Sequence, residues 1–125
     1  MKHIFSIAAA IALSACATVP TVGSAIRSDG LAMLGQQSRV GALVVTPQAV
    51  IEDSRCPINA RCVWAGRLVL KTRVAGAGWF ETVNLILGEP YATRGAALAL
   101  VSAEPGKMAG SQPSPAASLF GFEPR

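Results

Sequence analysis

Histidine is nearly absent from this 125-residue sequence: the single copy is His3, close to the start of the chain. Nucleophile relays of the Ser-His-Asp and Cys-His kinds need that side chain, and so does most general acid–base chemistry near neutral pH. Residues 1–15 have the pattern of a removable export signal, as described below, so we expect the mature chain to contain no histidine. This argues against whole classes of enzyme.

Carboxylates are scarce as well, with seven Asp and Glu against eleven Lys and Arg. Only Glu52 and Asp53 are neighbours, and neighbouring side chains on a strand point to opposite faces, so the two do not make a facing acid–base pair. Asp53 fits better as a turn acceptor or as the ion-pair partner of Arg55. We therefore predict that the chain is not an enzyme and uses no cofactor. Catalysis by carboxylates and arginines alone is the least favoured alternative.

Neither a membrane span nor a phosphate-binding loop is present in the sequence after residue 15. A charged residue, Gly or Pro interrupts every apolar run before it reaches the ~20 residues of a membrane-spanning helix. Gly76 and Gly78 match a phosphate-binding glycine motif only trivially, and they lie between two expected strands, as a turn would.

The N-terminal segment MKHIFSIAAAIALSACA is typical of a bacterial lipoprotein signal. It has Lys2 followed by an apolar stretch over residues 4–13, which is too short to span a bilayer. The sequence LSAC at residues 13–16 resembles the lipobox, where a peptidase cleaves before a cysteine that carries diacylglycerol. We expect residues 1–15 to be removed and residues 16–28 to form the lipidated N-terminus, on Cys16, and a short tether. The alternative, an ordinary signal, would leave an exposed thiol in an oxidising compartment.

The expected lipid predicts the cellular location of the protein. Acyl chains contribute ~0.8 kcal/mol per buried methylene, so a diacylglycerol with an amide-linked chain is an effectively permanent anchor. Ala17 follows Cys16, whereas an Asp there resembles an inner-membrane retention signal in enteric bacteria. We expect a protein of the bacterial envelope, anchored in the outer membrane and facing the periplasm.

The other two cysteines, Cys56 and Cys62, are an even number in an exported chain and predict a disulfide. Closing so small a loop stabilises the fold by roughly 2 to 3 kcal/mol. A zinc site would need further thiolate or imidazole ligands, so we predict no metal. A redox centre is the less favoured alternative, because five residues separate the cysteines where thioredoxin-type centres have two.

Short β-rich segments separated by Gly and Pro predict one all-β domain over residues 29–125, a small antiparallel β-sandwich or a partly open barrel. Strands are expected at residues 39–46, 48–53, 62–65, 67–74, 79–87, 96–103 and 119–123, with Pro47 separating the first two. The segment 96–103 is equally compatible with a short helix. Alternation in RLVLKTRV, residues 67–74, gives one apolar and one wet face. A four-residue loop, 75–78, would pair Leu70 with Val83.

The segment DSRCP at residues 53–57, followed by CVWAG at residues 62–66 and an alternating strand, resembles the core of an uncharacterised family of small bacterial envelope lipoproteins and exported proteins. The resemblance covers most of the mature chain. It implies an envelope location and a β fold, and it implies no activity. Trp64 lies two residues after Cys62, so we predict that its indole packs on the disulfide; an exposed anchor for a partner is the alternative.

Basic residues gather in the disulfide loop and in the strand that follows it. They are Arg55, Arg61, Arg67, Lys71 and Arg73. Three of them, Arg67, Lys71 and Arg73, would form a stripe able to meet anionic lipid headgroups or envelope glycans, although a solvated sheet face is the simpler interpretation. Export and the lack of aromatic–basic interleaving argue against nucleic acid.

The leading hypothesis is a non-enzymatic envelope lipoprotein whose disulfide-closed β-domain binds or braces another envelope component. Its partners would be the membrane, through the lipid on Cys16, and an envelope protein or an anionic glycan or lipid. The alternative is a protease inhibitor, because the disulfide would hold residues 57–61 rigid and present Arg61 to a trypsin-like enzyme.

Overall fold

The computed structural model of this chain describes residues 25–110 and 114–125. The expected signal peptide, the lipidation site Cys16 and most of the expected tether lie outside the described residues. Eight strands and one 3-10 turn make up the described part. They are β1 Leu31–Ala32, β2 Ser38–Val40, β3 Leu43–Asp53, β4 Leu68–Gly76, β5 Trp79–Ile86, β6 Pro90–Thr93, β7 Ala96–Glu104, η1 Pro115–Ala117 and β8 Leu119–Pro124. Within these two ranges no helix is long and apolar enough to cross a membrane.

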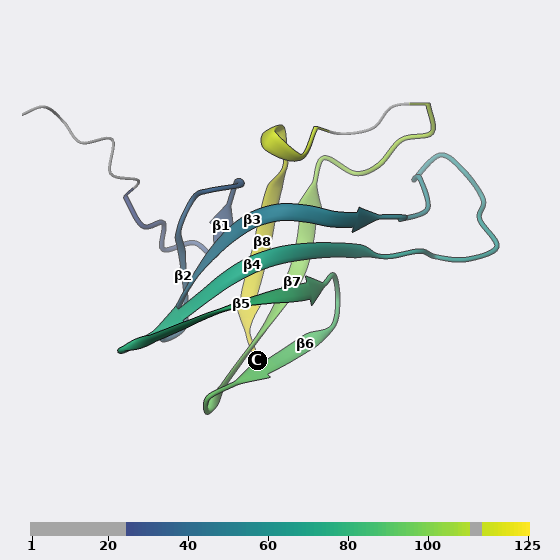
Figure 1. The fold of residues 1–125 in the computed structure, drawn as a ribbon. Helices are drawn as coiled ribbons and strands as arrows, with labels where there is room; N and C mark the ends of the chain where they lie inside the picture. Colours follow the sequence, from purple (N-terminus) through teal and green to yellow (C-terminus); the bar gives the residue numbers. More distant parts are fainter. Residues whose placement is uncertain (1–24, 111–113) are drawn as a thin grey trace, which may run out of the picture.

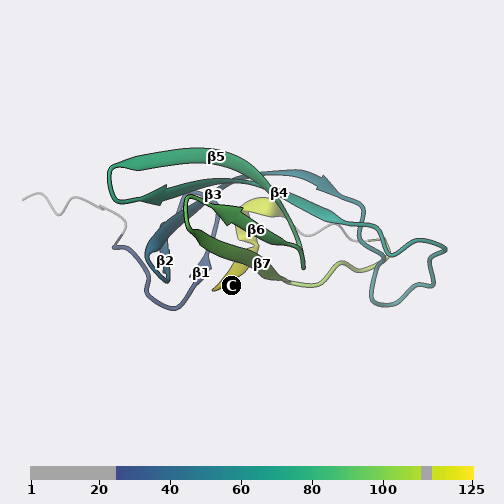
Figure 2. The same cartoon turned by 90° about the horizontal axis from the view of Figure 1, so that it is seen from below.

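The strands form two antiparallel sheets, which confirms the predicted all-β fold (Figure 1). The first sheet has the order β2-β3-β4-β5 and the second has the order β1-β8-β7-β6. The sheets lie one over the other as two layers (Figure 2) and are not closed into a barrel. Of the two predicted architectures, the sandwich is therefore the one found.

The core lies between the layers, and alternation along the strands fills it. In β4 the side chains of Leu70 and Val74 are fully buried while Lys71 and Arg73 are exposed, as the predicted apolar and wet faces require. Val69 is the exception: the alternation places it on the wet face, but it is only 6% exposed. The buried apolar residues of the first sheet are Val40, Leu43, Val45, Leu68, Leu70, Val74 and Leu85, and they meet Ala32, Leu98, Leu100, Ala103, Phe120 and Phe122 of the second.

The β4–β5 hairpin is tighter than the sequence analysis predicts. β4 continues to Gly76, which faces Trp79, so only Ala77 and Gly78 form the turn. Gly78 has φ of 77°, a conformation that two-residue hairpin turns need and that glycine adopts without strain. Leu70 consequently faces Leu85 and not Val83. The predicted register is wrong by two residues, and an even shift leaves the apolar face on the core side.

Pro47 does not separate two strands, as predicted, but lies inside the continuous strand β3. Its carbonyl oxygen accepts a hydrogen bond from the Gly35 N–H at 2.8 Å, so its nitrogen also points away from β4, where no ladder bond is lost. A bulge follows between Pro47 and Ala49. The segment 96–103 is the strand β7, whereas the strand expected at residues 62–65 is absent and this segment is a loop.

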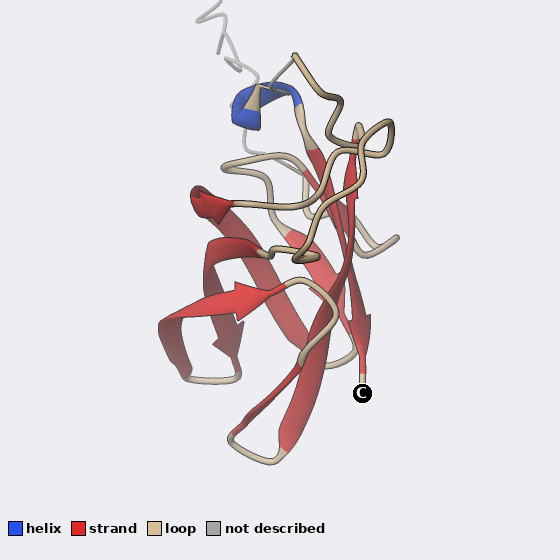
Figure 3. Ribbon diagram, turned by 90° about the vertical axis from the view of Figure 1, so that its right-hand side faces the viewer, coloured by secondary structure: helices blue, strands red, loops and turns tan. Residues whose placement is uncertain are grey.

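The two ends of the sandwich carry different connections. The turns β2–β3 and β4–β5 lie at one end, near Arg27, whose backbone pairs with β2. The long loop between β3 and β4 projects from the opposite end (Figures 1 and 2). Figure 3 views the molecule from that loop end, with the connections in tan in front of the strands.

Candidate functional site

Residues 54–67, called the hairpin tip below, continue the β3–β4 hairpin beyond the sandwich. The Ser54 N–H donates to the Arg67 carbonyl oxygen at 2.8 Å, and the Cys56 N–H donates to the Ala65 carbonyl oxygen at 3.0 Å. The predicted disulfide between Cys56 and Cys62 is present, with the Cα atoms 5.8 Å apart. The ladder aligns the two arms of the tip, and the disulfide closes its far part into a small ring.

Gly66 permits the two arms to approach this closely. Its φ is 67°, and a Cβ atom at this position would overlap the carbonyl oxygen of Ser54. Since an L side chain rarely adopts this conformation and has no room here, glycine is required. The last residue of the CVWAG motif thus has a structural explanation.

A second segment braces the tip from the side. The Ile58 N–H donates to the Lys107 carbonyl oxygen at 2.9 Å, and the Ala109 N–H donates to Asn59 Oδ1 at 2.7 Å. Within the ring the Ala60 N–H donates to the Pro57 carbonyl oxygen at 3.1 Å and forms a turn. The tip is therefore fixed by its own ladder, by the disulfide and by contacts some fifty residues away in sequence.

Large apolar side chains on the tip face solvent. Ile58 is 75% exposed, Val63 93% and Trp64 83%, so the predicted packing of Trp64 on the disulfide is wrong. The chain bends at residues 63–64 instead of running as a strand, and the two-residue spacing from Cys62 therefore does not place the indole beside the sulfur atoms. Three large exposed apolar side chains on one short, braced loop are typical of interaction sites.

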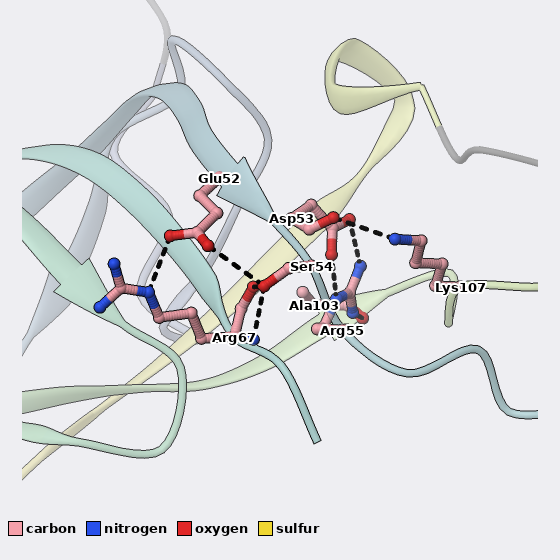
Figure 4. Close-up of polar contacts among 7 residues, drawn as sticks. All are labelled: Glu52, Asp53, Ser54, Arg55, Arg67, Ala103 and Lys107. Atoms are coloured by element: carbon pink, nitrogen blue, oxygen red, sulfur yellow. Dashed lines mark hydrogen bonds and ion pairs between the residues drawn. The ribbon is translucent and has the colours of Figure 1, made fainter. Parts of the chain in front are cut away.

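Asp53 and Arg55 form an ion pair at the base of the tip (Figure 4). Arg55 Nε and Nη2 donate to the two carboxylate oxygens of Asp53 at 2.8 and 3.0 Å, and Arg55 Nη1 donates to the Ala103 carbonyl oxygen at 3.4 Å. The two side chains are only 17% and 16% exposed, and Lys107 Nζ lies 3.0 Å from the Asp53 carbonyl oxygen. The ion-pair role predicted for Asp53 is confirmed, and Arg55 is not part of an open basic stripe.

Glu52 points to the opposite side of β3 (Figure 4), as the strand geometry predicts. It accepts a hydrogen bond from Arg67 Nε at 2.7 Å and another from the Ser54 hydroxyl at 3.2 Å. Glu52 and Asp53 therefore do not face each other and make no paired-carboxylate site.

The predicted basic residues separate into different surroundings. Lys71 and Arg73 lie exposed on the outer face of the first sheet, with Arg73 4.2 Å from the ring centre of Phe80. Arg67 is bound to Glu52, while Arg61 is exposed on the tip. Arg39 of β2 shares the outer face with Lys71 and Arg73, which the sequence analysis missed although alternation in residues 38–40 signals it.

Among the described residues, no group of three or more His, Cys, Asp or Glu side chains could hold a metal ion. No family model, no curated protein and no solved structure matches the chain. The functional assignment therefore depends on the geometry of the tip and its surroundings.

The ion pair predicts how stability depends on pH. The Arg55 guanidinium holds the pKa of the Asp53 carboxyl below its usual range, although burial acts in the opposite direction. A carboxyl whose pKa falls on folding stabilises the protein above its unfolded pKa of about 3.9, and this contribution is lost as the pH drops through the lower folded value. We expect the free energy of unfolding, measured with urea at pH 7, 4 and 2, to decrease less for Asp53→Asn than for the wild type. Parallel pH profiles for the two proteins would contradict this role of Asp53.

Proposed function

We propose that the chain is a non-enzymatic, lipid-anchored protein of the bacterial envelope that binds an envelope protein through its hairpin tip. The observation that carries this proposal is the exposure of Trp64, Val63 and Ile58 on a loop that is fixed before any partner arrives. The lipid on Cys16 is supported by the signal and lipobox pattern of the sequence. The resemblance of the DSRCP and CVWAG segments to envelope lipoproteins supports the same location.

The position of the tip suits a tethered binding protein. Arg27 pairs with Ser38, which lies across the sheet from Val45 and, one strand further, from Val74. Val74 is six residues along β4 from Leu68, where the tip joins this strand. At about 3.3 Å per strand residue, the base of the tip is roughly 20 Å from the end where the described chain begins. The described chain enters the domain at that end, opposite the tip, and this favours presentation of the tip away from a membrane that holds a lipid on Cys16.

The chemistry of the tip favours a protein partner. Trp and Arg are the residues most often found at the energetic centre of protein interfaces, and the tip exposes Trp64 beside aliphatic Val63 and cationic Arg61. Because the backbone of the tip is already bonded to Lys107 and Ala65, little loop entropy would be lost on binding.

Two other candidates have specific support. Exposed Lys71 and Arg73, with Arg39 on the same sheet face, would suit an anionic glycan or lipid. Inhibition of a trypsin-like protease is supported by the exposed Arg61 on a disulfide-closed ring. The turn from Pro57 to Ala60 departs from the extended peptide conformation that is recognised by strand addition, however, and this disfavours inhibition.

Lipid attachment can be tested directly. Cells that express the wild type with a clickable palmitate analogue should yield labelled protein in the membrane fraction, whereas Cys16→Ser should give unlabelled protein that leaves the membrane. Cys56→Ser with Cys62→Ser is the matched control and should remain labelled and membrane-bound. A labelled, membrane-bound Cys16→Ser variant would overturn the anchor assignment.

Binding through the tip is tested by placing a photoreactive residue at Val63, beside Trp64, and a control probe at Thr82 on the outer sheet face. We expect a discrete protein adduct from position 63 and none from position 82.

Truncating a Trp at an interface centre costs about 2 kcal/mol or more, roughly a thirtyfold loss of affinity, so Trp64→Ala should remove the adduct. Phe80→Ala, which truncates an exposed aromatic residue away from the tip, should leave it unchanged. Equal adducts at both positions, or capture that survives Trp64→Ala, would show that the tip is not the binding surface.

A further inference from the structure

A cavity of 280 Å³ opens between the two sheets at the base of the tip. It is lined by Val50, Asp53, Arg55, Leu68, Pro115, Ser118 and Phe120. These residues come from β3, β4, η1, β8, the single residue between η1 and β8, and the start of the tip. The cavity is thus a product of the folded sandwich and does not belong to the exposed apolar surface of the tip.

The inner part of the cavity is apolar. Leu68 and Phe120 are fully buried and form its floor, with the half-buried Val50 beside them. The volume of 280 Å³ is nearly twice the roughly 150 Å³ of an engineered apolar cavity that binds benzene. It is large enough for one aromatic ring or a short aliphatic chain with a headgroup.

Arg55 lines the cavity and keeps hydrogen-bond donors that its bonds to the described residues do not use. A guanidinium has five N–H groups, and Arg55 directs one each from Nε, Nη2 and Nη1 to Asp53 and the Ala103 carbonyl. Two N–H groups of Arg55 are therefore without a partner among the described residues. Both carboxylate oxygens of Asp53 already accept hydrogen bonds from Arg55. Glu104, whose negative charge also raises the pKa of Arg55, is exposed and does not line the cavity.

We propose that this cavity binds a small monocarboxylate with an apolar tail. The carboxylate accepts hydrogen bonds from the two N–H groups of Arg55 that have no partner within residues 25–110 and 114–125, because guanidinium and carboxylate are complementary in charge and in hydrogen bonding. The tail lies on Leu68 and Phe120. This binding requires neither the lipid on Cys16 nor the partner of the tip, so it stands or fails independently of the proposed function.

The test uses the mature chain with Cys16→Ser, which needs no detergent, and 3-phenylpropionate as the probe. Saturable shifts of the Val50 and Leu68 methyl signals in NMR spectra are expected on titration. The neutral analogue 3-phenylpropanol should bind about tenfold more weakly, because hydrogen bonds to a charged acceptor are the stronger ones.

Matched variants of β3 separate cavity binding from surface binding. Val50→Phe fills the cavity and should abolish the shift of Leu68, whereas Val44→Phe, on the outer face of the same strand, should bind like the wild type. If Val50→Phe does not fold, Val50→Leu should still weaken binding at least threefold. The proposal is overturned by methyl shifts that do not saturate, by equal affinity for acid and alcohol, or by unchanged binding in a folded Val50 variant.

Discussion

The ion pair between Asp53 and Arg55 joins the two sheets and the hairpin tip. Asp53 ends β3 in the first sheet, while Arg55 reaches the Ala103 carbonyl of β7 in the second sheet, and Lys107 returns to the Asp53 backbone. The pair therefore links the two sheets at the end of the sandwich where the tip begins. Both side chains are largely withdrawn from water, so removing one would leave the other as an uncompensated buried charge. This ion pair therefore matters more for folding stability than the exposed pair of Arg67 and Glu52.

The tip extends this arrangement outward. The backbone ladder and the disulfide hold Ile58, Val63 and Trp64 in solvent, a position that gains nothing from burial in the core. Such exposure contributes no folding stability, and the proposed contact with another molecule would account for it. The cavity lies at the base of the tip, and Arg55 lines it. A ligand in the cavity would therefore contact the same residue that supports the base of the tip.

Much of the fold could be predicted from local pattern, because alternation in residues 67–74 determines which side chains enter the core, and the cysteine count determines the disulfide. Predictions failed where tertiary contacts decide. The prediction for Trp64 assumes an extended backbone, whereas the chain bends at residues 63–64. The prediction for Pro47 assumes a break, although the nitrogen of Pro47 points away from β4. The sequence analysis misses the short strands β1 and β6, the cavity, and the turn at residues 41–42 that divides the predicted strand 39–46 into β2 and β3. The cavity could not be predicted, since it brings Phe120 against Leu68 from a distant part of the chain.

The central claim is that the tip is rigid before it meets a partner, and amide hydrogen exchange of the isolated protein tests this most directly. The N–H groups of Cys56 and Ile58 donate to Ala65 and Lys107. In the oxidised protein we expect them to exchange as slowly as amides of the β3–β4 ladder, and reduction of the disulfide should accelerate the exchange of both. Fast exchange at Cys56 and Ile58 in the oxidised protein would contradict the account, because the exposed side chains would then be carried by a loosely held loop.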